Sequence, residues 1–191
     1  MNQAAVVWDN HACLPFRDTA RWLPQIARFR RAGVDAVTIN IGDSHVPLET
    51  LTRMAAQIRG YVQEHPGEYV LGLSANDIRQ AKATGRLAVC LDIEGVFALG
   101  DRLPLVEHFY GLGVRWMLLV YNRGNLAGGG CHDADDPGLT PHGRTILAEM
   151  DRVGMIKCCS HTGYQTAREI LDESAGPVIF SHSNPRRLHD H

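Results

Sequence analysis

The chain has 191 residues, of which 45% are hydrophobic and 21% charged, and its formal net charge is −2 with neutral histidines. This length suits one domain with a sizeable core, and the small net charge gives no electrostatic reason to expect a nucleic acid or an anionic membrane as partner. No apolar run approaches the roughly 20 residues that span a bilayer, and residues 1–9 lack a signal-peptide pattern, so we expect a cytoplasmic protein.

Short apolar runs alternate with longer helical stretches along the whole chain. The expected strands are residues 4–8, 35–41, 69–73, 87–93, 114–120, 155–159 and 177–180. The expected helices are residues 19–32, 48–64, 74–82, 103–110, 141–153 and 164–173, and a last turn begins at Ser183. Residues 87–93 are nearly all apolar, which is typical of a parallel strand that is buried on both faces.

Strand–helix alternation at this spacing predicts a parallel α/β architecture. An open doubly wound sheet fits the length, whereas seven strands are most of a (β/α)₈ TIM barrel, whose usual length is about 250 residues. Polar residues at the strand ends favour the barrel, because a circle of parallel strands brings their carboxyl ends together. We therefore expect one (β/α)₈ TIM-barrel-like domain of the metal-dependent hydrolase type over residues 1–191, incomplete at its C-terminus with about seven strands.

Polar side chains follow the carboxyl ends of most expected strands. They are Asp9, His11, Asp43, His45, Asp92, Glu94, Tyr121, Asn122, His161 and His182. Any one histidine is more often a loop residue bonded to backbone, and Glu94 alone would suit a helix cap. Three histidines and a carboxylate on separate strands are together the donor set that Zn²⁺ prefers at catalytic sites, which predicts metal-assisted hydrolysis.

Two further patterns bear on this site. Asp92 and Glu94, two residues apart in a strand, point the same way and would suit a paired-carboxylate glycosidase, although the three histidines fit that reaction poorly. The run Gly128 to Gly130 lies too far from a helix start to cradle a phosphate, and we expect it to form a mobile flap beside the site.

A set of short motifs runs in order from residue 9 to the C-terminus. They are DNHACLP at 9–15, IEG at 93–95, GVR at 113–115, YN at 121–122, GLTPHG at 138–143, SH at 160–161 and PVIFSHS at 177–183. This ordered set resembles the membrane dipeptidase (renal dipeptidase, peptidase M19) family. The resemblance implies a (β/α)₈ barrel with a two-zinc site that hydrolyses dipeptides.

The resemblance also implies a role for each matching residue. His11 would bind one metal, His161 and His182 the other, and Glu94 would bridge the two. A bridging water would attack the amide carbonyl, with the metals stabilising the oxyanion. Glu94 and Tyr121 are then the candidate catalytic residues. Tyr121 and Asn122 are the candidate substrate-binding residues.

Three residues depart from the family pattern. Cys13 stands where the family has a metal-binding aspartate; a thiolate can bind Zn²⁺, so Cys13 is a candidate ligand, and a small buried apolar residue is the alternative. Tyr121 replaces a substrate-polarising histidine, and its phenol can still donate a hydrogen bond to an oxyanion. Cys158 replaces an aspartate, and we expect it to be a buried strand residue.

The family's substrate-carboxylate arginine and an acidic residue of its eighth strand would lie beyond His191, so we expect the barrel to stop before it closes. Unpaired edges at the first and seventh strands would promote association, which predicts a homo-oligomer. The main hypothesis is a zinc-dependent hydrolase of dipeptides or related small amides with one or two Zn²⁺. The alternative is a catalytically impaired or inactive barrel fragment that acts as a binding or oligomerising module.

Overall fold

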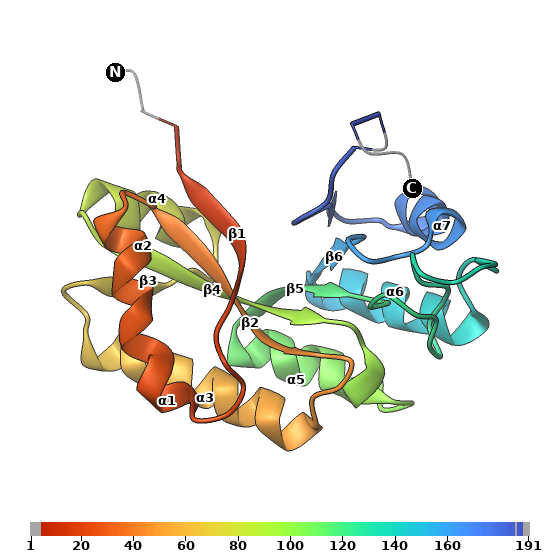
Figure 1. The fold of residues 1–191 in the computed structure, drawn as a ribbon, viewed down its shortest axis with the longest axis horizontal. Coiled ribbons are helices and arrows are strands. Elements are labelled where there is room, and N and C mark those ends of the chain that lie inside the picture. Colours follow the sequence, from red (N-terminus) through yellow and green to blue (C-terminus); the bar gives the residue numbers. More distant parts are fainter. Residues whose placement is uncertain (1–4, 186, 189–191) are drawn as a thin grey trace. The chain divides into compact units, whose positions relative to one another are not determined.

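The computed structural model describes residues 5–185, 187 and 188, and these residues form two compact units (Figure 1). The first unit comprises the chain through Ile93 together with His108–Arg115, and the second comprises Glu94–Glu107 and the chain from Trp116 onward. Within the described residues no helix combines the length and apolarity needed to cross a bilayer. The end of the last turn, which we expected to run from Ser183 to His191, lies outside the described residues.

The first unit is built from parallel strands and the helices that connect them. Its strands are β1 (Trp8–Cys13), β2 (Ala36–Asp43), β3 (Tyr69–Leu71) and β4 (Leu87–Glu94), the last ending at the first residue of the second unit. Its helices are α1 (Thr19–Trp22), the 3₁₀ turn η1 (Leu23–Ile26), α2 (Ala27–Arg31), α3 (Leu48–Glu64) and α4 (Ala75–Ala83). β1 pairs in parallel with β2, and β3 pairs in parallel with β4.

The second unit repeats this organisation. Helix α5 (Pro104–Leu112) and strand β5 (Val114–Leu118) belong partly to each unit, and the 3₁₀ turn η2 (Phe97–Leu99) precedes them. The remaining elements are α6 (Pro141–Val153), β6 (Ile156–Cys158), α7 (Tyr164–Glu173) and β7 (Val178–Ile179). β5 pairs in parallel with β6, and β6 with β7, so the described residues contain the seven strands that the sequence predicts.

The long helices form where an apolar stripe or a capping residue in the sequence favours a helix. In α3 the buried residues recur every three or four positions, and the helix packs on β2 and β3; they are Leu51, Met54, Ala55, Ile58 and Val62. The Ser74 hydroxyl accepts a hydrogen bond from the Asp77 backbone N–H and so caps α4 as predicted. The Thr140 hydroxyl caps α6 in the same way, through the Gly143 N–H at 2.9 Å. The predicted bounds of α3, α6 and α7 are correct.

Two of the predicted elements differ substantially from the structure, while the ends of the other predicted strands and helices are within two residues of the observed ones. Residues 19–32 do not form one helix, because Pro24 has no N–H to donate and its ring clashes with the preceding turn; the segment divides into α1, η1 and α2. The first strand is Trp8–Cys13 and not residues 4–8. Val6 and Val7 before it are exposed, and the polar segment 9–13 instead pairs with β2, with a register irregularity between Asp9 and Ala12.

Candidate metal centre

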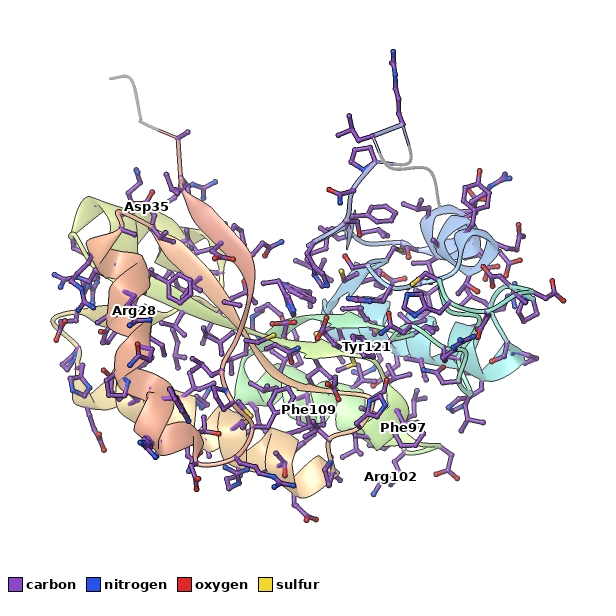
Figure 2. The ribbon with its side chains drawn as sticks, viewed as in Figure 1. Arg28, Asp35, Phe97, Arg102, Phe109 and Tyr121 are labelled. Carbon is purple, nitrogen blue, oxygen red and sulfur yellow. The ribbon has the colours of Figure 1, made fainter. Side chains whose placement is uncertain are left out.

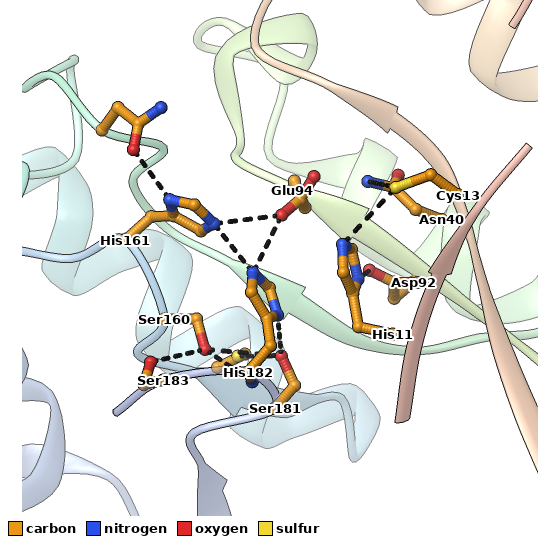
Figure 3. A network of polar contacts seen from close by, with 12 residues as sticks. His11, Cys13, Asn40, Asp92, Glu94, Ser160, His161, Ser181, His182 and Ser183 are labelled. Atoms are coloured by element: carbon orange, nitrogen blue, oxygen red, sulfur yellow. Dashed lines mark hydrogen bonds and ion pairs between the residues drawn. The ribbon is translucent and has the colours of Figure 1, made fainter. Parts of the chain in front are cut away.

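Three predicted ligands of the second unit converge at the carboxyl ends of their strands. Glu94 is the last residue of β4 and is 5% exposed, His161 follows β6 by a short turn, and His182 follows β7. Glu94 Oε1 lies 3.3 Å from His161 Nε2 and 3.2 Å from His182 Nε2 (Figure 3). The two Nε2 atoms are 2.8 Å apart. Each residue therefore presents one ligand atom to a common point.

The partners of the two imidazoles determine which nitrogen carries the proton. His161 Nδ1 lies 2.7 Å from Asn122 Oδ1, an oxygen that can only accept, so Nδ1 carries the hydrogen and Nε2 presents a lone pair. His182 Nδ1 lies 2.8 Å from Ser181 Oγ, and this hydrogen bond holds the ring with its Nε2 toward Glu94 and His161. The His161 Nε2 lone pair thus faces the Glu94 carboxylate and His182 Nε2, and a cluster of such ligand atoms suits a cation. Outer hydrogen bonds of this kind are typical of histidine ligands.

The separations fit a tetrahedral ion. With zinc–nitrogen and zinc–oxygen bonds of their usual lengths, ligand atoms lie about 3.4 Å apart. The two separations from Glu94 Oε1, 3.3 and 3.2 Å, agree with this value. The distance of 2.8 Å between the histidine nitrogens is shorter, so the imidazoles would separate by about half an ångström on binding an ion.

Backbone strain marks the residues that hold this cluster. Asn122 and His161 have φ angles of 60° and 62°, a left-handed conformation that non-glycine residues adopt rarely and that gathers at functional sites. Backbone hydrogen bonds hold both: the His132 N–H donates to Asn122 O at 2.8 Å, and the Cys131 N–H donates to His161 O at 3.0 Å. Gly95, with φ 107°, lets the chain turn directly after Glu94.

The glycine run that we expected to be a mobile flap is instead a packed part of the centre. Gly128, Gly129 and Gly130 are buried. A Cβ on Gly130 would lie 2.3 Å from Asn122 O, and one on Gly129 would lie 2.2 Å from the Asp136 carboxylate. A Cβ on Gly128 would lie 2.7 Å from the Thr166 side chain, so each glycine of the run has a neighbour that leaves no room for a side chain. The glycine run is therefore a packed wall beside Asn122.

Tyr121 and Asn122 follow β5 and lie beside His161. The Tyr121 ring centroid is 4.6 Å from that of His161, with the planes inclined by 43°, and the side chain is half-buried (Figure 2). Asn122, expected as a substrate-binding residue, uses its side-chain oxygen to orient His161. This orienting contact was not predicted, because neither it nor the left-handed conformation of Asn122 has a signal in the sequence.

A serine network supports the second-unit cluster and was also missed. The Ser160 hydroxyl accepts from the His182 N–H at 3.1 Å and from the Ser183 hydroxyl at 3.2 Å. Cys158 is a buried strand residue, as expected, and its sulfur lies 3.1 Å from Ser181 Oγ. The only sequence signal for these contacts was that Ser160 and Ser181 each precede a histidine.

The remaining predicted ligands, His11 and Cys13, lie in the first unit, within β1 and not beyond its end. His11 Nε2 is 3.6 Å from Cys13 Sγ, and His11 Nδ1 is 3.2 Å from the buried Asp92 carboxylate. Cys13 is exposed, so the alternative that it is a small buried apolar residue is wrong. His45 is 82% exposed at its side chain and contacts Asp43 at 3.6 Å, which suits a loop residue.

Comparison with known proteins identifies relatives. The model of the membrane dipeptidase family, peptidase family M19, matches residues 26–191. An uncharacterised dipeptidase of Schizosaccharomyces pombe is 38% identical over 103 residues, which are 53% of this chain and 25% of that protein. Dipeptidase tcpJ of Claviceps purpurea is 35% identical over 120 residues, which are 61% of this chain and 28% of that protein. The chain thus spans about a quarter of the length of these curated relatives.

Solved structures show the same fold. An amidohydrolase from Pseudomonas aeruginosa aligns with a TM-score of 0.87 and 29% identity, over 98% of this chain and 55% of that chain. A metallo peptidase from Rhodobacter sphaeroides, liganded with a phosphinate mimic of the dipeptide L-Ala-D-Ala, aligns with a TM-score of 0.80 and 20% identity, over 96% of this chain and 66% of that chain. The predicted fold class, a parallel α/β fold of the incomplete TIM-barrel-like type, is confirmed.

Proposed function

Because the chain belongs to the membrane dipeptidase family, peptidase family M19, we propose that it is a zinc-dependent hydrolase of dipeptides or related small amides. The observation that carries this proposal is the convergence of Glu94, His161 and His182 on one point, with His161 oriented by the Asn122 oxygen and His182 hydrogen-bonded to Ser181. Relatives and structural neighbours described as dipeptidases and metallo peptidases support the substrate class and the need for a metal.

The donor set suits zinc. Two neutral imidazoles and one carboxylate leave a fourth position open, as in catalytic zinc sites. Zinc, when bound, supplies a Lewis acid that polarises a carbonyl and makes water a better nucleophile at neutral pH. The family resemblance is the basis for proposing a second ion. In that proposal His11 and Cys13 are its ligands and Glu94 is a bridge.

The chain's own side chains would contribute positioning and hydrogen bonds. Asn122 holds His161 in the tautomer that presents Nε2. Glu94, besides being a ligand, is the carboxylate that would accept a proton from the attacking water. Tyr121, beside His161, would donate its phenol hydrogen to the oxyanion that develops on the amide, and its neutral O–H suits this role near pH 7. The amide NH₂ of Asn122 would be a donor to substrate.

The test is metal quantitation together with hydrolysis of a panel of dipeptides by the purified protein. We expect at least one zinc per chain and hydrolysis, and we expect His161→Ala to lose that ion and the activity. His45→Ala is the matched control, because His45 is a solvent-exposed histidine and should keep both. Unchanged metal content and turnover in His161→Ala would contradict the proposal. Metal retention without hydrolysis of any dipeptide would instead support the non-catalytic binding module.

A further inference from the structure

The first unit contains a second ligand pair whose chemistry differs from that of the cluster around Glu94. His11 and Cys13 lie two residues apart on β1, and the pairing of β1 with β2 shifts its register between Asp9 and Ala12, at the position of His11. Register shifts of this kind re-aim side chains beside functional sites. Here the result is an imidazole nitrogen and a sulfur 3.6 Å apart (Figure 3).

The Asp92 carboxylate determines the tautomer of His11. Asp92 is fully buried in β4, and its Oδ2 lies 3.2 Å from His11 Nδ1. A carboxylate accepts, so His11 Nδ1 carries the hydrogen and Nε2 directs its lone pair toward the Cys13 sulfur. A carboxylate behind a histidine in this arrangement is the usual outer partner of a metal-binding imidazole.

The distance between the nitrogen and the sulfur also fits an ion. With bonds of about 2.0–2.1 Å to nitrogen and about 2.3 Å to sulfur, two ligands of a tetrahedral zinc lie about 3.6 Å apart. His11 Nε2 and Cys13 Sγ are separated by 3.6 Å. The buried Asn40 amide lies 4.0 Å from Cys13 Sγ and directs its N–H toward the sulfur.

We propose that His11 and Cys13 form a thiolate–imidazole position that selects thiophilic ions such as Zn²⁺, Co²⁺ and Cd²⁺ over Mg²⁺ and Mn²⁺. A carboxylate at residue 13 would suit the harder ions, whereas sulfur prefers the softer ones. On binding, the Cys13 thiol releases its proton to solvent and the sulfur becomes a ligand. The proposal rests on the metal dependence proposed above and extends it to the first unit. Its test measures a metal–sulfur bond and does not depend on hydrolysis.

The experiment is a Co²⁺ titration of the full chain, monitored by the near-ultraviolet charge-transfer band that only a cobalt–thiolate bond produces. We expect the band in the wild type and its loss in Cys13→Ser and Cys13→Asp. Cys131→Ser is the matched control, because Cys131 is the other exposed cysteine and its variant should keep the band. Competition titrations should show that Cys13→Asp lowers the ratio of Cd²⁺ to Mn²⁺ affinity by about tenfold or more.

The outcomes separate this inference from the proposed function. If cobalt binds to the wild type without a charge-transfer band, or if Cys13→Ser keeps the band, the thiolate position does not exist, and the ligand role of His161 is unaffected. If the band is present and His161→Ala changes neither metal content nor hydrolysis, the proposed function fails and the thiolate position stands. We expect His161→Ala to keep the band while it loses one ion.

Discussion

At the scale of single residues, the candidate centre depends on how each imidazole is held. Asn122 accepts from His161 Nδ1 at 2.7 Å, and both residues adopt left-handed backbone conformations that are stabilised by neighbouring amides. The contact leaves Nε2 of His161 as a lone pair directed at Glu94 and His182. The orientation of a candidate ligand is therefore determined by Asn122, which contacts the opposite nitrogen of the ring.

Removing this acceptor should weaken zinc binding. We expect Asn122→Ala to reduce zinc affinity by about 10- to 100-fold, because His161 loses the partner that selects its tautomer. Asn122→Asp keeps an acceptor oxygen and tolerates the same backbone conformation, so it should bind zinc nearly as well as the wild type. Competition with a chromophoric chelator measures both affinities. Equal zinc affinities for the alanine variant and the wild type would show that Asn122 has no orienting role.

At the scale of elements, the loop between β5 and α6 acts as a wall of the centre. The Gly129 N–H donates to Thr166 Oγ1 at 3.0 Å, and the Gly163 N–H donates to Gly129 O at 3.0 Å, so the loop is tied to the start of α7. Gly130 lies against the backbone of Asn122, the residue that orients His161. The packing of this loop therefore affects the position of Asn122.

A side chain at Gly130 should disturb both stability and metal binding. We expect Gly130→Ala to lower the free energy of unfolding by about 1–3 kcal/mol, because its Cβ would overlap the Asn122 backbone. Zinc affinity should fall in the same variant. Gly67→Ala is the control: Gly67 is exposed, and an added Cβ there meets nothing within 4 Å, so its effect should stay within about 0.5 kcal/mol. Urea unfolding compares the two, and equal stabilities would refute the close-packing argument.

A buried ion pair joins α6, β6 and the turn before β7. Lys157 on β6 has a side chain only 1% exposed, and its ammonium contacts the Asp151 carboxylate of α6. Asp151 also accepts from the N–H groups of Ala175 and Gly176, each at 2.9 Å. Burial alone would raise the pKa of Asp151, but Lys157 and these two amides outweigh it and hold the pKa below its ordinary value. One carboxylate thus organises three segments.

Removing that carboxylate should be costly. We expect Asp151→Ala to lower the free energy of unfolding by about 3–5 kcal/mol, because it leaves the Lys157 ammonium buried without its partner. Glu107→Ala removes one member of an exposed ion pair with Arg152 and should cost less than about 1 kcal/mol. Denaturant unfolding of both variants at neutral pH provides the measurement. A cost for Asp151→Ala as small as that for Glu107→Ala would mean that the buried pair contributes little.

At the scale of the whole molecule, three strands have a single strand neighbour among the described residues. β1 pairs with β2 alone, β3 with β4 alone and β7 with β6 alone. Val7, directly before β1, is 54% exposed, and Trp8 in β1 is 44% exposed. An edge strand with exposed apolar side chains is a template for association with another chain. The prediction of a homo-oligomer follows from this property.

The mass of the protein in solution tests the prediction. We expect the wild type to have at least twice the monomer mass of 21.1 kDa by light scattering, because β1 offers an open apolar edge. Val7→Lys should shift the protein toward the monomer at the same concentration. Leu126→Lys changes an apolar residue that is 63% exposed and lies in the loop between β5 and α6, whereas Val7 directly precedes the edge strand β1, so Leu126→Lys should leave the mass unchanged. A monomer mass for the wild type at every concentration would refute the prediction.

Much of the organisation was predictable because its signals are local. The helix α3 has an apolar stripe, and α4 and α6 begin at the capping residues Ser74 and Thr140. The candidates Glu94, His161 and His182 were predictable as well, since each follows an apolar run and matches a family motif. The bounds of β1 were not predictable, because a polar segment became a strand only by pairing with β2, about 28 residues away along the chain.

By itself, the sequence determined the alternation of strands and helices, the ends of most helices and the family, because these depend on residues within a few positions of one another or on ordered motifs. Only the tertiary structure decided that Asn122 orients His161, that Asp92 orients His11 and that the glycine run is a packed wall. These contacts join residues that are distant in the chain, and whether two such residues meet depends on how the backbone between them packs, which no local pattern encodes.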